Sequence, residues 1–475
     1  MGNEMVSVGI DIGTTTMSMI VSRLGITNMA AAHMVPDINI SKKEIIYRSP
    51  LYLTPLIDQE TLDGEKIRQI ITEEYEHAQI RPDMIDTGAV IITGESALKK
   101  NAEIITQSLS MLAGDFVVAT AGPDLESVLA GRGAGAEKFS KKYACMIANL
   151  DIGGGTTNIS LFDCGELIGQ TCIDVGGRLI RYDEQHVIRY VSPRLAALAE
   201  TRGVTFTVGE HLDEWELEQA AEILADTIFD SISPEHGVLT KIATTYSSEP
   251  LELGSPIPFL SFSGGVADCY YRKEQDRYRY LDLGVALAQE LARREPEIAA
   301  EIVEPEETIR ATVVGAGTYT TEVSGSTISY EEDIFPIKSL PVCVLSQKAE
   351  DLLFEGESGA ALDELTWFKE QSQIDELGIF IRGKQQTGYR ELIRMADGLI
   401  LLGEHVLAGG KPLIVICRND IAKALGQIMS SRKHGGRTII CLDRIRMRSG
   451  DYIDIGSPVM DGMAVPIVVK TLIFY

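Results

Sequence analysis

Cysteine is scarce in this chain of 475 residues, and the seven cysteines stand singly along it. No two of them have the C-x-x-C spacing that zinc and iron–sulfur sites use, so the sequence argues against a cluster held by thiolates. An odd, dispersed set also provides no disulfide framework, which favours a reducing compartment. The seven histidines are scattered as well, and none is paired at ligand spacing.

Long apolar runs and positive charge are also missing. No apolar stretch approaches the roughly 18 residues that a membrane helix needs, and no charged-then-apolar leader precedes the first strand. The chain is therefore predicted to be neither exported nor membrane-spanning, and to work in the cytoplasm. A formal net charge of −26 would be repelled by a nucleic-acid backbone or an anionic membrane, so neither is expected as a partner.

The most informative stretch that is present runs from Met146 to Ser160. An apolar run fit for a buried strand ends at Asp151, and three glycines and two threonines precede a second apolar run. Consecutive glycines let backbone N–H groups approach an anion, threonine hydroxyls add donors, and a carboxylate can hold a hydrated Mg²⁺. Together these groups suit a nucleoside triphosphate. Alone, such a stretch could also be a flexible hairpin loop.

The N-terminus repeats this pattern and makes the simple loop a poorer explanation. Residues 6–21 contain an apolar strand, Asp11, Gly13, a run of three threonines and an alternating apolar strand. Two copies predict two similar half-domains, each of which presents a hairpin to one phosphate tail.

This pair resembles the phosphate-1 and phosphate-2 motifs of the actin, sugar kinase and Hsp70 ATPase superfamily. Residues 258–263 indicate a buried strand that leads into Gly264-Gly265-Val266-Ala267-Asp268, which resembles the adenosine motif. Residues 123–132 and 284–290 resemble the first and second connecting motifs. The resemblance implies an α/β protein of the actin-like (ribonuclease H-like) fold, with duplicated half-domains around a nucleotide cleft and an additional C-terminal α/β region.

The resemblance also implies the cofactors, ATP and Mg²⁺, and the residues that hold them. Asp11 and Asp151 would bind Mg²⁺ through water, and with Thr156 they are the predicted catalytic residues. The predicted nucleotide-binding residues are Gly13, Thr14, Thr15 and Thr16 at the β-phosphate, Gly153, Gly154, Gly155 and Thr157 at the γ-phosphate, and Gly264, Gly265 and Val266 at the adenosine.

Two positions depart from the superfamily pattern. Hsp70-like members have a glutamate before the proline of the first connecting motif, whereas Gly122 precedes Pro123 here. Asp124 and Glu126 remain as candidates for orienting the attacking water. The adenine-stacking arginine of Hsp70 falls on Asp268. Both departures favour slow switching over rapid turnover.

Three domains are predicted. Residues 1–145 and 146–305 would form the two ATPase half-domains, the second with a helical insertion. A charged, proline-bearing stretch near residue 300 marks the next boundary. Residues 306–475 carry no metal or nucleophile pattern, and they are the predicted target-contacting part because ATP binding does not need them.

A more specific resemblance covers essentially the whole chain. It rests on Asp151-Ile-Gly-Gly-Gly-Thr-Thr-Asn158, Asp174-Val-Gly-Gly-Arg178, Val323-Ser-Gly-Ser-Thr327 and Asp454-Ile-Gly-Ser-Pro458, which together resemble the family of ethanolamine ammonia-lyase reactivating factors. That family implies an ATP-dependent, chaperone-like protein whose partner is ethanolamine ammonia-lyase. It would release damaged cobalamin so that adenosylcobalamin can rebind. A sugar-type small-molecule kinase, or an actin-like or Hsp70-like ATPase with another partner, is the alternative. Homo-oligomer formation and association with a bacterial microcompartment stay open.

Overall fold

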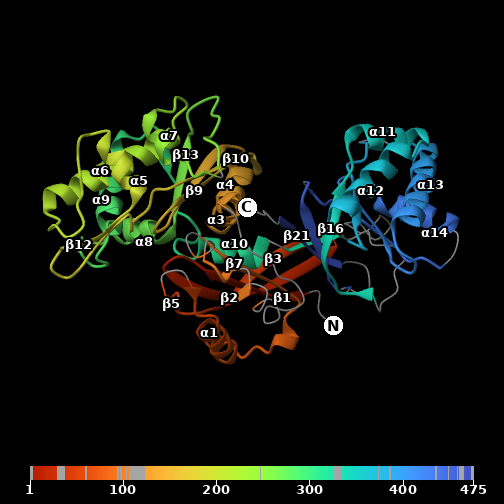
Figure 1. The fold of residues 1–475 in the computed structure, drawn as a ribbon, viewed down its shortest axis with the longest axis horizontal. Helices are drawn as coiled ribbons and strands as arrows, with labels where there is room; N and C mark the ends of the chain where they lie inside the picture. Colours follow the sequence, from red (N-terminus) through yellow and green to blue (C-terminus); the bar gives the residue numbers. More distant parts are fainter. Residues whose placement is uncertain are drawn as a thin grey trace.

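The structure is a computed structural model. It describes residues 4–28, 38–58, 61–93, 96, 99–102, 104–105, 109, 123–246, 248–319, 321–324, 334–372, 374–384, 387–433, 436–447, 449–456, 458 and 465–471. Figure 1 shows three groups of elements along the long axis, with a first sheet at the centre, a second sheet on one side and the C-terminal elements on the other. None of the described helices combines the length and apolar composition that a membrane crossing requires.

The first sheet has the strand order β3-β2-β1-β7, with β4 also paired to β2. β1 and β2 form an antiparallel hairpin, and β7 lies parallel to β1 on its other side. The elements of this part are β1 (Glu4–Ile12), β2 (Thr16–Asn28), β3 (Ile38–Arg48), β4 (Tyr52–Leu53), β5 (Leu56–Asp58), β6 (Thr61–Leu62), α1 (Gly64–His77), η1 (Pro82–Met84) and β7 (Thr87–Ile92). The carboxylate of Asp63 caps α1 by accepting a hydrogen bond from the backbone N–H of Lys66.

The second sheet repeats this arrangement in the order β10-β9-β8-β13-β14. β8 (Met146–Ile152) and β9 (Thr157–Asp163) form the antiparallel hairpin, β10 (Glu166–Ile173) extends it, and β13 (Phe259–Ser263) lies parallel to β8. Even the register repeats, since Asp11 lies opposite Ser18 in the first hairpin and Asp151 opposite Asn158 in the second. This repeat confirms the predicted α/β fold with duplicated half-domains.

Two helices join the sheets. α3 (Pro123–Gly133) packs on β8, β9 and β10 of the second sheet, whereas α10 (Ala311–Tyr319) packs on β1, β2 and β7 of the first. α3 and α10 also cross each other (Figure 1). A Cβ atom on Gly133 would lie 1.8 Å from the carbonyl oxygen of Ala311, so this crossing has no room for a side chain there.

The crossing corrects the prediction of the second connecting motif. Residues 284–290 begin α9 (Gly284–Arg294), which packs on α6 and α8 inside the second half. The helix that meets α3 is α10 instead. Both segments are rich in small residues, so composition alone could not distinguish them.

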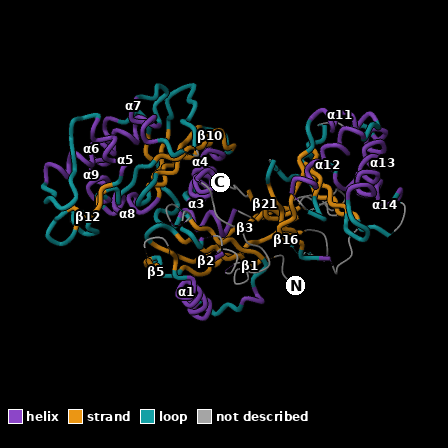
Figure 2. Tube along the Cα trace, viewed as in Figure 1, coloured by secondary structure: helices purple, strands orange, loops and turns teal. Residues whose placement is uncertain are grey.

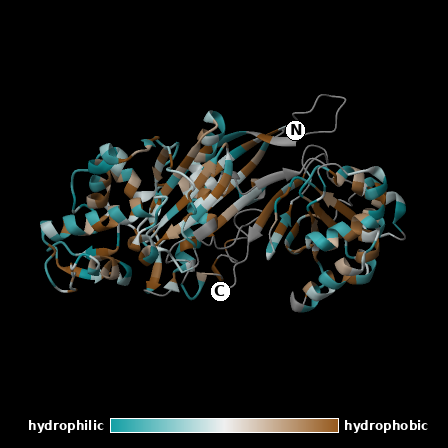
Figure 3. Ribbon diagram, turned by 90° about the horizontal axis from the view of Figure 1, so that it is seen from above, coloured by the Kyte–Doolittle hydropathy of each residue, from teal (hydrophilic) through white to brown (hydrophobic). Residues whose placement is uncertain are grey.

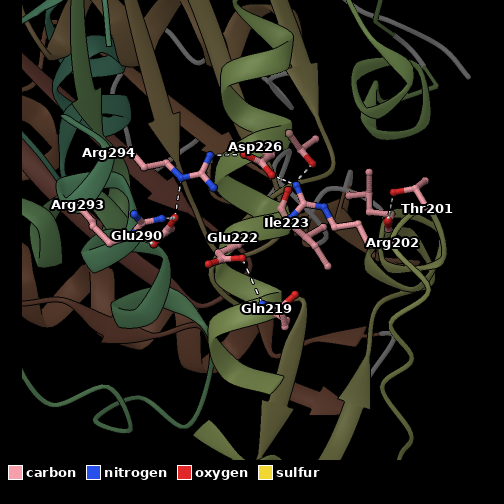
Figure 4. Close-up of polar contacts among 11 residues, drawn as sticks. Thr201, Arg202, Gln219, Glu222, Ile223, Asp226, Glu290, Arg293 and Arg294 are labelled. Carbon is pink, nitrogen blue, oxygen red and sulfur yellow. Dashed lines mark hydrogen bonds and ion pairs between the residues drawn. The ribbon is translucent and has the colours of Figure 1, made fainter. Parts of the chain in front are cut away.

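The second half has further elements on both faces of its sheet (Figure 2). Its elements are α4 (Ala136–Tyr143), β11 (Ile180–Tyr182), β12 (Ile188–Val191), α5 (Pro193–Glu200), α6 (Glu214–Ser231), α7 (Val238–Ala243), α8 (Gly264–Arg272), η3 (Glu295–Glu297) and β14 (Glu301–Ile302). Ion pairs tie α6 to α9, because Arg294 of α9 lies between Glu290 and Asp226, and Asp226 also pairs with Arg202 (Figure 4).

The C-terminal elements form a third α/β group with the strand order β15-β21-β20-β16-β17-β18-β19. The strands are β15 (Thr321–Ser324), β16 (Ile337–Val344), β17 (Gly378–Ile381), β18 (Leu413–Cys417), β19 (Ile439–Leu442), β20 (Asp451–Ile455) and β21 (Val465–Thr471), and β16 to β19 are parallel. The helices α11 (Gln347–Glu355), α12 (Gly359–Ser372), α13 (Tyr389–Val406) and α14 (Ala422–Arg432) share a hydrophobic core with one face of these parallel strands. Figure 3 shows apolar residues concentrated on the strands and polar residues on the outer helices.

The C-terminal group is connected to the junction of the two halves. α10 leads through residue 320 into β15, which pairs with β21. Val468 of β21 is buried in a small core with Leu129 of α3 and Ala316 of α10. The third part of the chain therefore packs on the helices that join the first two.

Candidate nucleotide-binding site

The turns of the two hairpins have the same backbone hydrogen bond. The N–H of Gly13 donates to the carbonyl oxygen of Thr16, and the N–H of Gly153 donates to that of Thr156, both at 2.9 Å. Thr14 and Thr15 form the bend between β1 and β2. The structure therefore repeats in the backbone what the two sequence motifs repeat in residue type.

The two turns face each other. A Cβ atom on Gly154 would lie 3.4 Å from the Oγ1 atom of Thr15 in the first hairpin. Gly155 has open space around the position that a Cβ atom would take. The predicted β-phosphate and γ-phosphate residues are thus brought together, with the side chain of Arg178 beside Gly154 and Thr15.

Asp11 lies at the end of β1 and accepts a hydrogen bond from the Oγ1 of Thr93 at 3.1 Å. Burial raises the pKa of Asp11 from 3.8 to about 7; the hydrogen bond from Thr93 opposes this shift, and the charge of Asp151 adds to it. The two aspartates are therefore close enough to repel each other.

Asp151 lies at the corresponding place in β8, and its two oxygens have different partners. Oδ1 accepts a hydrogen bond from the Oγ of Ser263 at 2.6 Å, and Oδ2 accepts one from the Oγ1 of Thr312 at 3.3 Å. Burial raises the pKa of Asp151 to about 6, although both hydroxyls lower it. Ser263 comes from β13 and Thr312 from α10, so Asp151 is oriented by the strand that precedes the predicted adenosine residues and by a joining helix.

This pair of carboxylates fits a hydrated Mg²⁺. Asp151 is buried and Asp11 is partly buried. Two such carboxylates that repel each other are costly as anions, and a divalent cation between them would remove much of that cost. Among the described residues no group of three His, Cys, Asp or Glu side chains is gathered as a metal site. One or two carboxylates completed by water and phosphate oxygens is the usual protein setting for Mg²⁺.

The predicted adenosine residues lie at the start of α8. Gly264 has a φ angle of +92°, and a Cβ atom there would lie 2.4 Å from the carbonyl oxygen of Ile152. Its N–H donates to the carbonyl of Thr308 at 3.1 Å. Gly265 has open space where a side chain would point. Only glycine suits the first position, and the second leaves the backbone accessible.

Two predicted contact residues have side chains that point elsewhere. Thr157 is buried, and its hydroxyl donates to the carbonyl of Val175 at 2.7 Å. Val266 is buried in the core of the second half, beside Gly177. Both side chains point into the protein, so contact of Thr157 and Val266 with a nucleotide is left to their backbone, and their nucleotide-binding role stays a prediction.

The departures from the superfamily pattern have different outcomes. Gly122 and the side chain of Asp124 lie outside the described residues, so the water-orienting group stays a prediction, with Glu126 half-buried on α3. Asp268 pairs with Arg272 at 3.2 Å and accepts a hydrogen bond from Thr308. This carboxylate is thus held by its own helix and by the segment that precedes α10.

Sequence reasoning missed the residues that support the two aspartates. Thr93, Ser263 and Thr312 are single hydroxyl residues far from their partners in the chain. Thr93 and Ser263 lie at the end of a strand, which was the available signal, whereas Thr312 lies at the start of α10. Arg178 was noted only as part of a pattern, yet its Nη1 donates to the Oγ1 of Thr15 at 2.9 Å.

Comparisons with known proteins find relatives along the whole chain. The model of the family described as "Ethanolamine utilisation protein EutA" matches residues 3–475. Two relatives named ethanolamine ammonia-lyase reactivase EutA, from Salmonella typhimurium and Escherichia coli strain K12, are 37% and 36% identical over 473 residues, 99% of this chain and of each relative. A solved Ppx/GppA family member from Aquifex aeolicus is 17% identical, with a TM-score of 0.36 over 66% of this chain and 87% of its own. The chain belongs to the EutA family of ethanolamine utilisation proteins.

Proposed function

We propose that this protein is an ATP-dependent reactivating factor for ethanolamine ammonia-lyase. It releases damaged cobalamin from the inactivated lyase, so that intact adenosylcobalamin can rebind. The observation that carries this proposal is the likeness to proteins named reactivases over 99% of both chains. That likeness includes the C-terminal group, which a nucleotide site alone does not explain.

The two facing hairpins support ATP hydrolysis as the energy source. Asp11 and Asp151 would hold Mg²⁺ through water, and the turns 13–16 and 153–156 would donate N–H and hydroxyl groups to the phosphates. Mg²⁺ supplies neutralising charge at the phosphate oxygens when it is bound. Gly264 and Gly265 would let the adenosine lie against backbone. The protein's own contribution is position, which is what phosphoryl transfer chiefly needs.

The joining helix α10 supports coupling of the site to the target. Thr312 of α10 contacts Asp151, and the same helix leads into β15 of the C-terminal group. A change at Asp151 can therefore move the elements that we propose to contact the lyase. ATP can drive release only if one nucleotide state binds the opened lyase more tightly than the other.

The domain division stays part of this proposal. Residues 1–145 and 146–305 would form the ATPase halves, and residues 306–475 the target-contacting part, with α10 as its link to the hairpins. The protein would act in the cytoplasm. Fractionation of cells would decide whether it accompanies the lyase into a microcompartment.

Recovery of lyase activity tests the function. Lyase inactivated with cyanocobalamin is incubated with this protein, Mg²⁺ and ATP, and deamination of ethanolamine is followed after adenosylcobalamin is added. We expect recovery only when both ATP and this protein are present, with release of free cyanocobalamin. Hydrolysis of ATP without recovery would favour a small-molecule kinase or an ATPase with another partner. Recovery that is independent of ATP would refute the proposed energy source.

A further inference from the structure

Arg178 lies where the two hairpins meet and bonds to both. Its backbone N–H donates to the carbonyl oxygen of Gly154 at 2.7 Å, in the second hairpin. Its side-chain Nη1 donates to the Oγ1 of Thr15 at 2.9 Å, in the first hairpin. The arginine therefore connects the two halves at the point where the phosphates are expected, and its side-chain bond depends on how the halves are placed relative to each other.

The loop that carries Arg178 is fixed to the second hairpin. A Cβ atom on Gly176 would lie 2.5 Å from the carbonyl oxygen of Gly154, and one on Gly177 would lie 2.8 Å from the Cα of Gly284. The N–H of Gly177 donates to Gly153 at 3.0 Å. Because the backbone is held this closely, movement at this loop is left to the arginine side chain.

Not all N–H donors of the Arg178 guanidinium are used in hydrogen bonds to the described residues. Its Nε is buried and makes no hydrogen bond to any residue that the structure describes, and the Oδ2 atom of Asp282 lies 3.7 Å from it. The other oxygen of Asp282 accepts a hydrogen bond from the N–H of Gly284 at 2.8 Å, which fixes the carboxylate. Asp282 thus holds the positive charge of Arg178 in place without occupying all of its N–H donors. The side chain of Arg178 is 35% exposed. The planar guanidinium has further N–H donors at its two Nη atoms, and such a fork suits phosphate oxygens.

We propose that Arg178 senses the terminal phosphate of ATP: it binds Thr15 when that phosphate is absent and binds the phosphate when it is present. This inference rests on the proposed function, because it assigns a residue to the same site. Exchange of Thr15 for a phosphate oxygen would release a direct bond between the two halves. The protein could then distinguish ATP from ADP through one side chain.

Nucleotide affinity tests the proposal without using lyase recovery. Calorimetry in the presence of Mg²⁺ gives the Kd for ADP and for a non-hydrolysable ATP analogue, with the wild type and with Arg178→Gln and Arg178→Lys. In Arg178→Gln we expect the analogue to bind about tenfold or more weakly, since a charge-assisted hydrogen bond is lost, and ADP to bind within about twofold of the wild type. For Arg178→Lys we expect a Kd for the analogue between those of the wild type and Arg178→Gln, because lysine keeps the positive charge but lacks the planar pair of N–H donors.

The matched control is Arg181→Gln. Arg181 lies three residues further along, and its guanidinium stacks on the ring of Tyr190 at 4.5 Å. We expect this substitution to change neither Kd, although it removes the same charge from the net total. A loss of analogue affinity equal to that of Arg178→Gln would show that the net charge of the second half is responsible and would overturn the assignment.

Further outcomes separate this proposal from the proposed function. Suppose that Arg178→Gln weakens the binding of ADP and of the analogue equally, or changes neither Kd, while the wild type reactivates the lyase. The sensor proposal then fails and the proposed function stands. If the wild type binds neither nucleotide, both fail. Should Arg178→Gln not fold, Asp282→Asn carries the test, because Asn keeps an acceptor for Gly284 and removes the charge that anchors the arginine. We again expect weaker binding of the analogue with unchanged binding of ADP. An equal change in the two Kd values, relative to the wild type, would refute the sensor proposal.

Discussion

Gly315 packs against Leu129 so closely that a Cβ atom at Gly315 would lie 2.0 Å from the Leu129 carbonyl oxygen. The two residues belong to α10 and α3, the helices that join the two half-domains. In the first sheet, a Cβ atom on Gly9 would likewise lie 2.7 Å from the carbonyl oxygen of Val313 in α10. Backbone therefore lies against backbone along the junction, and relative motion of the halves has to pass through these contacts.

Substitution Gly315→Ala should separate the two helices. A methyl group cannot be placed 2 Å from a backbone carbonyl, and neither helix can adjust it by a side-chain rotation, so we expect a loss of about 3 kcal/mol or more in the free energy of unfolding. Urea denaturation followed by circular dichroism measures it. Gly359→Ala, at the start of α12 with open space around it, is the control and should stay within about 1 kcal/mol. Equal stability of both variants would mean that the junction is looser than the structure shows.

Removal of either aspartate should abolish reactivation and leave the fold intact. Burial raises the pKa of Asp11 to about 7 and that of Asp151 to about 6, so both carboxylates are held at a cost to stability. Asp11→Ala and Asp151→Ala should therefore unfold at a temperature equal to or above that of the wild type. Loss of Mg²⁺ binding should lower ATP hydrolysis and lyase recovery by about 100-fold or more. A variant that still rescues the lyase would remove the nucleotide from the mechanism.

The two hairpins could be predicted because their pattern is local. In each, a buried strand, an aspartate, glycine and threonine follow one another within ten positions, and backbone geometry follows directly from those residue types. The support of Asp151 could not be predicted in this way. Ser263 and Thr312 lie 112 and 161 positions away from it, and nothing in a single sequence links a hydroxyl to a carboxylate at that distance. The crossing of α3 and α10 is likewise a tertiary contact.

The hydroxyl of Ser263 should set the affinity for Mg²⁺-nucleotide. Its hydrogen bond lowers the pKa of Asp151 against the effect of burial, so Ser263→Ala should leave more of the carboxyl protonated near neutral pH. We expect the Kd for Mg²⁺-ATP to rise by roughly 5- to 30-fold, and by more at pH 6 than at pH 8. Thr312→Val removes a longer bond, 3.3 Å against 2.6 Å, and should have the smaller effect. Calorimetry at the two pH values measures both, and the opposite ranking would contradict the geometry.

Glu290 should stabilise the second half in a pH-dependent way. Burial raises its pKa, but hydrogen bonds from Arg293 and Arg294 outweigh burial and hold the pKa below its ordinary value of 4.5 (Figure 4). The ionised form is therefore favoured by folding, and its contribution is fully present above pH 4.5 and lost as the pH falls through the folded pKa. Glu290→Gln should cost about 1–3 kcal/mol at pH 7 and much less near pH 3. Urea denaturation at both pH values measures the change, and a cost independent of pH would show that packing, not charge, is lost.

The matched control for Glu290 lies on the facing helix. Glu222 of α6 accepts a hydrogen bond from the amide of Gln219 at 3.2 Å (Figure 4). Glu222 is half-buried, and Gln keeps an acceptor for this amide, so Glu222→Gln should change the free energy of unfolding by less than about 0.5 kcal/mol at either pH.

Two tryptophans of similar exposure can decide which part of the chain contacts the lyase. Trp367 of α12 is 63% exposed in the C-terminal group, and Trp215 of α6 is 60% exposed in the second half-domain. Exposed tryptophans often dominate the binding energy of an interface, because they bury a large area with little conformational freedom to lose. If residues 306–475 contact the target, Trp367→Ala should weaken binding to inactivated lyase by about tenfold or more, and Trp215→Ala should leave it within about twofold. Biolayer interferometry with immobilised lyase, in ATP and in ADP, measures both. Weakening by Trp215→Ala alone would move the contact surface to the ATPase half, and the C-terminal group would then have to act on that half through α10 and β21.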